Sequence, residues 1–349
     1  MEIPHEKLDR TFKTIIIVII AIAALILLKD IVVPVSFAAL FSIIMLPLVK
    51  RLDRRVGKIL SIIIVLFASL LSIALVMWFV ISQLASLVAS LPDLEDKFSA
   101  LIISLSASAS TYLQITSEEQ TRMLHDAIQH FSTYAGEVLL STSYLVYFFI
   151  QVPVYIFLFL LYRERFKEFL LALRPGSDLK WKDEIQSVVR AYISGLSLVV
   201  FIAGALNSIG LLILGIQHAI FFGFLSGMLT MIPYVGITIG ASLPAILALL
   251  TKDSAWYAVG VIGVHSFVQF LEANFITPKI TGSRISINAL AAIVALLIGG
   301  KIWGIAGMIL AVPLVGILKI LLSYSPALKP FVILLGDESE GDLGKNKPG

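Results

Sequence analysis

Residues 59–82 read ILSIIIVLFASLLSIALVMWFVIS and carry no charged side chain. Such a run can cross the hydrocarbon core of a bilayer as a helix, because about 20 apolar residues are long enough. Lipid offers no partners to backbone polar groups, so a spanning segment must satisfy them internally. The sequence therefore predicts an all-α, polytopic integral membrane protein, with further spans expected at residues 12–28, 31–49, 139–162, 193–216 and 254–271.

Composition agrees with this fold class and excludes several functions. Hydrophobic residues make up 58% of the chain and charged residues 14%, whereas soluble domains contain about a half and about a quarter. The net charge is +3 and the basic residues cluster beside apolar runs, which favours lipid headgroups over nucleic acid as partners. There is no cysteine and no nucleotide-loop, nucleophile-elbow or metal motif, so we expect no enzyme, cofactor or metal.

Basic residues also indicate the orientation. They crowd the loops at residues 50–58 and 163–190, which the positive-inside rule assigns to the cytoplasm. Both chain termini are expected on the same side. The first apolar run is interpreted as a retained span rather than a signal peptide, because no small-residue cleavage pattern precedes Lys29.

The longest polar stretch, residues 83–138, is expected outside. Apolar residues recur at helical spacing from Leu84 to Ile102 and again from Leu124 to Val138, which predicts an external amphipathic helical hairpin. Thr116 and Glu119 have the spacing of a capping box for its second helix. The membrane surface or neighbouring subunits could cover the apolar face of this hairpin.

Glycine and proline interrupt the later apolar segments. The sequence Met231-Ile232-Pro233-Tyr234-Val235-Gly236 divides residues 219–250 into pieces of about 14 residues, each shorter than an ordinary span. A second interruption is expected within residues 285–322, at Gly299, Gly300, Lys301 and Gly304. Each stretch is either a pair of tight spans or a re-entrant hairpin, whose irregular backbone must face protein or a water-filled cavity.

Alternative interpretations of the glycines remain open. GxxxG spacings at Gly223/Gly227, Gly236/Gly240 and Gly300/Gly304 are also typical of close helix packing. The two broken stretches resemble each other, so span 193–216 with the first stretch and span 254–271 with the second could form an inverted repeat. Its solute site would lie near the middle of the membrane, between the two breaks.

Polar side chains in the apolar segments are the next candidates, because such groups are unfavourable in lipid and usually face the protein interior. His265, Gln269 and Glu272 share one helix face, with Asn274 just beyond. They could form a solute path or proton relay in which Glu272 titrates and Arg284 is its partner. Alternatively, Glu272 caps the helix end while the others bond to neighbouring helices. Asn207 and Asn288 are interpreted as interhelical hydrogen-bonding residues, and Lys279 and Arg284 could be orientation charges.

Three motifs resemble those of the autoinducer-2 exporter (AI-2E, PerM-like) permease family. They are Ile232-Pro233-Tyr234-Val235-Gly236 with Gly240 and Pro244, then Asn274 with Pro278-Lys279-Ile280 and Gly282, and then Gly299-Gly300, Gly304, Gly307 and Ala311-Val312-Pro313-Leu314. The resemblance implies a homo-oligomeric permease of a bacterial-type inner membrane. Some family members export the autoinducer-2 signal, and others are linked to sodium or lithium exchange for protons. Ile237 stands where many relatives carry a second proline.

The leading functional hypothesis is a permease that exports a small polar, autoinducer-2-like solute in contact with membrane lipids. A Na⁺(Li⁺)/H⁺ antiporter and a non-transporting membrane scaffold are the alternatives. The expected organisation is membrane spans at 1–82, the external hairpin at 83–138, a span with a basic cytoplasmic segment at 139–192, a transport core at 193–323 and a cytoplasmic tail at 324–349. The expected substrate path comprises Pro233, Tyr234, Gly236, Gly240, Pro244, His265, Gln269, Glu272, Asn274, Pro278, Lys279, Arg284, Asn288, Gly300, Gly304, Gly307 and Pro313.

Overall fold

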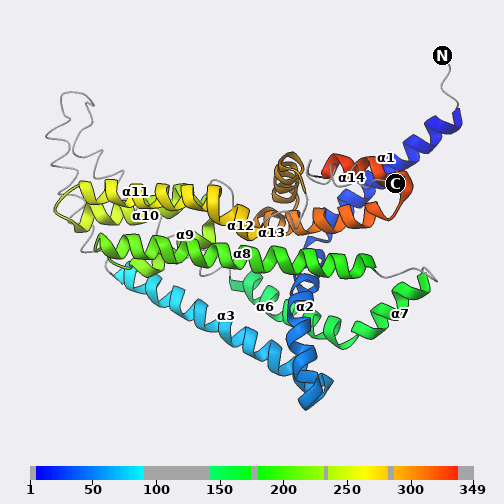
Figure 1. Ribbon diagram of the computed structural model, residues 1–349, viewed down its shortest axis with the longest axis horizontal. Coiled ribbons are helices and arrows are strands. Elements are labelled where there is room, and N and C mark those ends of the chain that lie inside the picture. The colour runs from blue at the N-terminus through cyan, green and yellow to red at the C-terminus, as the bar shows by residue number, and fades with distance from the viewer. Residues whose placement is uncertain (1–4, 90–141, 174–179, 232–234, 282–286, 337–349) are drawn as a thin grey trace, which may run out of the picture. The chain divides into compact units, whose positions relative to one another are not determined.

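The computed structural model describes residues 5–89, 142–173, 180–231, 235–281 and 287–336 (Figure 1). Most of the predicted external hairpin therefore lies outside the described residues. The same holds for Pro233, Tyr234 and Arg284 of the expected substrate path, and for the tail from residue 337.

Helices make up nearly all of the described chain, as the apolar runs predict. Five of them are long and apolar enough to cross a membrane, and the prediction of a helical multi-pass membrane protein is confirmed. In chain order the elements are α1 (His5–Leu27), α2 (Lys29–Val56), α3 (Lys58–Ala89), α6 (Thr142–Leu161), α7 (Arg163–Leu173), α8 (Lys180–Ile213), α9 (Ala219–Leu229), α10 (Val235–Thr251), α11 (Trp256–Leu271), the π-helix η1 (Glu272–Ile276), α12 (Thr277–Thr281), α13 (Ala289–Ser323), the 3₁₀-helix η3 (Pro326–Leu328) and α14 (Lys329–Leu335).

Several helices are longer than the charge-free runs from which they were predicted. Helix α3 continues to Ala89, and α8 already begins at Lys180. Helix α11 was expected to end at residue 271, but the π-helix and α12 extend it to Thr281. The expected ends were wrong because they were placed where charge or polarity begins. A helix that leaves the hydrocarbon region keeps its hydrogen bonds in water and need not end there.

The chain forms two compact units. Unit 1 comprises residues 1–66, 150–193 and 283–349, and unit 2 comprises residues 67–149 and 194–282. Leu40, Val189 and Leu310 form a buried core in unit 1. In the same unit, Arg163 of α7 donates a hydrogen bond to Asp53 of α2, with Nη2 and Oδ2 2.7 Å apart. This ion pair links two basic segments that were predicted to be cytoplasmic.

Unit 2 packs α9, α10 and α11 against the later half of α8 (Figure 1). Its core includes Leu211, Phe222, Ala248 and Val261, each almost completely buried. Apolar side chains on the outer faces are strongly exposed, among them Ile213 at 80% and Trp78 at 69%. A water-soluble protein would not leave such surfaces uncovered, so this pattern agrees with lipid as the surrounding medium.

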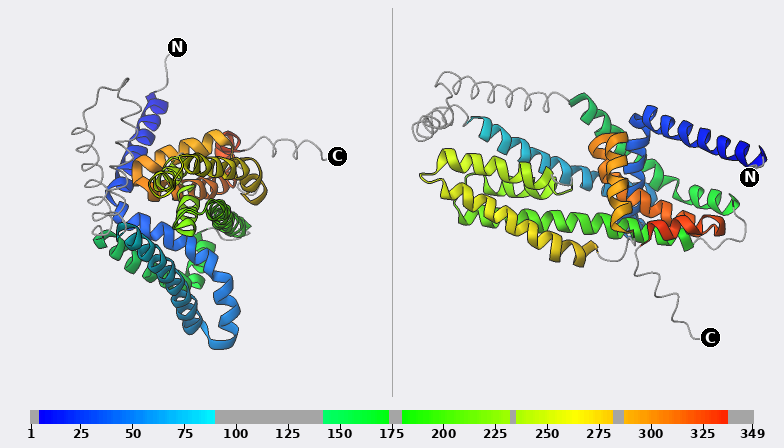
Figure 2. Two further views of the ribbon diagram at one scale, coloured as in Figure 1. Left: turned by 90° about the vertical axis from the view of Figure 1, so that its left-hand side faces the viewer. Right: turned by 90° about the horizontal axis from the view of Figure 1, so that it is seen from above.

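The interruption predicted at Met231–Gly236 begins slightly earlier, since α9 ends at Leu229, and Val235 and Gly236 already belong to α10. The second interruption was predicted over too many residues. Gly299, Gly300 and Lys301 are helical, and the backbone leaves helical geometry only at Gly304, where φ is 63° and ψ is −141°. Helix α13 changes direction sharply there (Figure 2). At 1.5 Å per residue, the arms 289–303 and 305–323 are roughly 22 and 28 Å long.

Candidate functional site

Unit 2 gathers buried polar side chains among apolar helices. Among the described residues the buried polar or charged side chains are Ser61, Asn207, Ser208, Ser226, His265, Glu272 and Lys319. Those from Asn207 to Glu272 belong to unit 2. Polar groups in membrane-spanning helices are unfavourable unless they find partners, so each of these positions needs an explanation.

Ser226 of α9 is the centre of this polar group. Its Oγ lies 2.8 Å from the Phe222 carbonyl oxygen, 3.0 Å from the Gly240 carbonyl oxygen of α10 and 3.0 Å from Nε2 of His265 on α11. A single hydroxyl thus contacts three helices. Both side chains are almost completely shielded, Ser226 at 2% exposure and His265 at 4%.

Ser226 and His265 have few hydrogen atoms to donate, and their number decides which hydrogen bonds can form. Nδ1 of His265 lies 2.9 Å from the Val261 carbonyl oxygen, which can only accept, so Nδ1 carries a hydrogen. In a neutral imidazole, Nε2 carries no hydrogen and accepts a hydrogen bond from the Ser226 hydroxyl. That hydroxyl then has no hydrogen left to donate to the Gly240 carbonyl oxygen. In an imidazolium, Nε2 donates to Ser226 and the hydroxyl proton is free to bond Gly240. Addition of one proton to His265 would therefore allow a hydrogen bond from Ser226 to Gly240 on α10, and its loss would remove that bond.

Glycines allow the helices to approach closely enough for these bonds. A methyl group at Gly223 would collide with the backbone and hydroxyl of Ser208 on α8, and one at Gly227 would lie 2.6 Å from the Val200 carbonyl oxygen. On α10, a methyl group at Gly240 would lie 2.7 Å from Oγ of Ser226. The Gly223/Gly227 spacing thus serves close packing, which was the alternative interpretation of the motif.

Asn207 of α8 lies between two packed faces of its helix. Ser208 faces α9 at Gly223, while Gly210 faces Val264 of α11. Successive helical residues are about 100° apart, so Asn207 points between these directions. Its side chain is 4% exposed, and its Oδ1 has no hydrogen-bond partner among the residues that the structure describes. An acceptor is therefore available among the helices that also carry Ser226 and His265.

Glu272 lies at the first position of the π-helical segment that follows α11. Its side chain is 8% exposed, and its Oε2 is buried with no hydrogen-bond partner within the described ranges. Single π-helical turns inside longer helices often mark functional positions. Asn274, by contrast, is exposed and donates from Nδ2 to the Phe270 carbonyl oxygen 2.9 Å away. Of the residues on the predicted face, His265 and Glu272 are buried and Gln269 is half-buried, while Asn274, expected just beyond the face, is exposed.

Asn288 and the last glycines of the expected path lie in unit 1. Asn288 caps α13, because its Oδ1 accepts from the Ala291 N–H at 2.8 Å, and its Nδ2 donates to the Leu334 carbonyl oxygen at 2.7 Å. Gly307 contacts the Gly299 carbonyl group across the bend, and Gly304 forms the bend. Pro313 is buried in the second arm, and the three atoms nearest to a methyl group at Gly300 would all belong to the side chain of Met308.

The remaining predicted residues occupy varied surroundings. Pro244 is buried inside α10 and Gln269 is half-buried on α11, whereas Pro278 and Lys279 are exposed on α12. Gly236 lies in the first turn of α10. No group of three or more His, Asp or Glu side chains within the described ranges could hold a metal ion.

Sequence reasoning missed Ser226, Ser208 and Lys319. Ser226 lies between the glycines at 223 and 227 in a charge-free run. Helices pack closely at such glycines, so the Ser226 hydroxyl could be expected to contact a neighbouring helix. Lys319 is a lysine within an apolar helix; it is 7% exposed, and its Nζ lies beside Gly336. A search for every polar residue inside apolar runs would have found all three.

Comparisons with known proteins converge on one description. A family model described as "AI-2E family transporter" matches residues 15–327. "Putative transport protein YueF" of Bacillus subtilis is 30% identical over 82% of this chain and 82% of its own length. YrrI of the same organism, described in the same way, is 28% identical over 85% of this chain and 87% of its own length. "AI-2 transport protein TqsA" of Escherichia coli is 22% identical over 88% and 90% of the respective chains.

Proposed function

This chain belongs to the AI-2E family of transporters, and from that premise we propose that it is a permease that exports a small polar solute resembling autoinducer-2. The relative TqsA, described as an AI-2 transport protein, supports this class of substrate. The proposed setting is a bacterial-type inner membrane, with both termini in the cytoplasm and the chain assembled as a homo-oligomer. The proposed transport core is residues 193–323.

The observation that carries the proposal is the buried Ser226–His265 pair, together with the buried Asn207 side chain on α8 of the same unit. The Asn207 Oδ1 is an unused acceptor, and the Ser226 hydroxyl has more acceptors in reach than protons to donate. A neutral, hydroxyl-rich solute can supply the missing donors, as well as an acceptor. Among the described residues of unit 2, no lysine or arginine is buried and Glu272 is the one buried carboxylate, which favours a polar but uncharged cargo.

The broken helices support the same proposal. The chain is interrupted between α9 and α10 and again at Gly304, and each interruption follows a helical arm shorter than an ordinary span. Both interruptions bring small residues of their two arms together, Ser226 with Gly240 in the first and Gly299 with Gly307 in the second. This common form is what an inverted repeat would produce.

The test is transport of labelled autoinducer-2 by the purified full chain in liposomes, with Ser226→Ala as the diagnostic variant. We expect the initial counterflow rate to fall about tenfold, because an unpartnered buried acceptor on His265 would cost about 1–3 kcal/mol. Ser242→Ala is the matched control, since Ser242 is exposed on α10 and donates only to its own helix, 3.2 Å from the Ile239 carbonyl oxygen.

The control rate should stay within about twofold of wild type, a change of less than about 0.5 kcal/mol. Equal rates for the two serine variants would refute a role for the polar group. If wild-type liposomes move no autoinducer-2 or related polyol in either direction, the permease proposal fails and the non-transporting scaffold becomes the better interpretation.

Glu272 favours a second candidate function, exchange of protons for small cations. An ionised carboxylate that is buried without partners is strongly destabilising, so this group needs a bound proton or a bound cation. One oxygen atom, Oε2, is buried and has no hydrogen-bond partner in the described parts of the chain. Competition between a proton and Na⁺ or Li⁺ for such an oxygen is the simplest form of coupled exchange.

Glu272→Gln tests this candidate, because it keeps the shape of the side chain and removes its titration. If exchange depends on Glu272, cation-driven proton flux in liposomes should fall more than about tenfold, a loss of about 1.4 kcal/mol or more. Asp253→Asn is the control, since Asp253 is an exposed carboxylate in the same unit. Full flux in the Glu272→Gln variant would eliminate the antiporter.

A further inference from the structure

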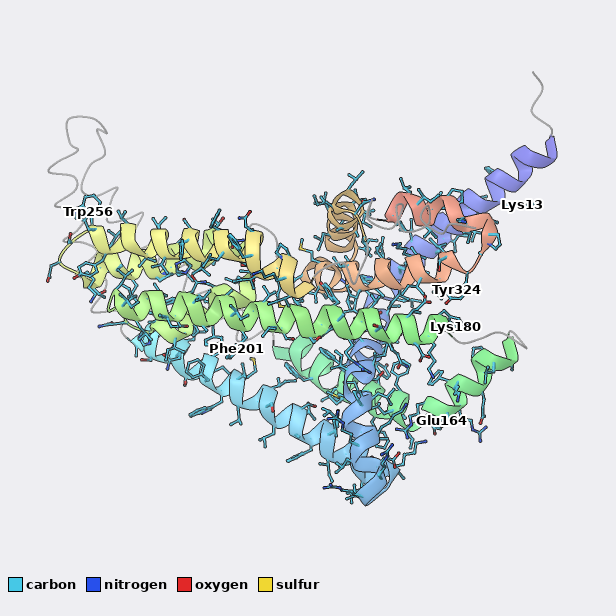
Figure 3. All side chains as sticks on the ribbon, viewed as in Figure 1. Lys13, Glu164, Lys180, Phe201, Trp256 and Tyr324 are labelled. Carbon is cyan, nitrogen blue, oxygen red and sulfur yellow. The ribbon has the colours of Figure 1, made fainter. Side chains whose placement is uncertain are left out.

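Unit 2 contains an apolar pocket on the opposite side of α9 from the polar group. Its volume is about 520 Å³, and it is bounded by α3, α8 and α9. Leu75 and Val76 line it from α3, Val200 and Phe201 from α8, and Ile220 and Phe224 from α9. Every side chain in its lining is apolar except that of Ser197. Phe201 projects from α8 on the side of α3 (Figure 3).

The pocket opens to the outside through strongly apolar residues. Leu75 is 58% exposed and Phe201 is 60% exposed, so the mouth is continuous with the lipid-facing surface of the spanning helices. The walls, by contrast, are well packed. The rings of Phe201 and Phe224 lie 5.8 Å apart, and Phe224 contacts Gly204 of α8.

One end of the pocket adjoins a polar rim. Gln83 of α3 and His218 at the start of α9 are hydrogen-bonded, with Oε1 and Nδ1 2.9 Å apart. Lys252 lies beside Gly215 of the α8–α9 turn. Its Nζ lies over the ring of Tyr257, 5.2 Å from the ring centroid. Trp256 is 79% exposed at the same end of the helices (Figure 3). Such aromatic and basic residues are typical of the membrane–water interface.

Size decides between the possible occupants. A helix of about 10 Å diameter needs roughly 120 Å³ per residue, so the pocket would hold little more than one helical turn of another protein segment. A methylene group occupies roughly 30 Å³, about the share of one water in the liquid, so a 16-carbon chain needs roughly 480 Å³. The volume of this open pocket is therefore of the order of one acyl chain.

We propose that this pocket binds one acyl chain of a membrane phospholipid, with the headgroup at the Gln83–His218 end. The apolar lining matches the chain, the rim matches the polar headgroup, and the open mouth gives access from the bilayer. Bound lipid would press against the face of α9 opposite Ser226 and would support the first arm of the broken stretch. The pocket is thus a lipid site beside a transport element rather than part of the solute path.

The test uses the full chain in detergent, freed of lipid, with one molar equivalent of phosphatidylcholine that carries a photoactivatable diazirine in one 16-carbon acyl chain. We expect saturable labelling of about one lipid per chain, mapped to the pocket lining. Leu75→Trp fills the mouth and should reduce labelling about fivefold. Ile73→Trp is the matched control, because Ile73 is an exposed apolar residue of α3 outside the pocket, and it should stay within about twofold of wild type.

A second filling variant, Ile220→Trp on α9, keeps the test decisive if Leu75→Trp does not fold. Labelling spread over exposed residues such as Ile213 in proportion to their exposure would overturn the proposal. Equal labelling of the filling and control variants, or pocket crosslinks to a second copy of the chain, would do the same. The assay contains no solute, so its failure and a failure of the transport proposal are separate results.

Discussion

Replacing Gly307 by alanine is expected to separate the two packed arms of α13, to lower the stability of the protein and to abolish transport. A methyl group at Gly307 would collide with the backbone carbonyl of Gly299 and would lie 2.9 Å from Cβ of Trp303. These obstacles are backbone and the root of a side chain, so no rotation relieves them. Overpacking usually costs about 1–3 kcal/mol, and a collision with backbone belongs at or above the upper end of that range.

Thermal unfolding in detergent and liposome transport should both report this change. We expect the midpoint to fall by roughly 5 °C or more, since about 3 kcal/mol corresponds to several degrees in a protein of this size. Gly300→Ala is the control, because the atoms nearest to a methyl group there belong to the flexible Met308 side chain, with Cε at 2.6 Å. A Gly307→Ala variant as stable and active as Gly300→Ala would show that the arms of α13 do not pack through Gly299 and Gly307.

The existence of both interruptions followed from composition, but their form did not. Pro233 lacks a backbone N–H, and the glycines around it disfavour a helix, so a break after residue 229 was predictable. Gly299, Gly300 and Gly304 look alike in sequence. Gly304 alone has a positive φ, while Gly299 stays helical because the other arm contacts it. Which glycine bends and which one packs depends on the tertiary contact.

Only part of the candidate site was predicted, because the rest of it also depends on tertiary contacts. His265 and Glu272 could be found because a titratable group in an apolar run is conspicuous, and both are buried. Ser226 is a small, common residue, and its role comes from Gly240 and His265, which lie on two other helices. Helical spacing relates residues of one helix. It carries no information about which residue of another helix is within hydrogen-bonding distance.

Replacing Gly304 by alanine is expected to reduce transport more than tenfold while it lowers stability less than Gly307→Ala does. No atom of the described residues lies within 4 Å of a methyl group at Gly304, so their packing does not oppose the substitution. The backbone does, because φ of 63° with ψ of −141° is a conformation that residues with a Cβ rarely adopt and that costs them of order 1–3 kcal/mol. Alanine also favours a continuous helix, by about 1 kcal/mol relative to glycine.

Both terms act on the same equilibrium, between the bent and the straight form of α13. Their sum is roughly 2–4 kcal/mol. Most molecules will adopt the straight form if the bent form is more stable by less than this amount in the wild-type chain. Gly263→Ala is the matched control, since a methyl group there also meets nothing within 4 Å but the residue is helical. Distance measurements between spin labels at the exposed positions Leu290 and Leu321 should lengthen in Gly304→Ala and stay unchanged in Gly263→Ala. A lengthened distance with full transport would mean that the bend at Gly304 serves the fold but not the passage of solute.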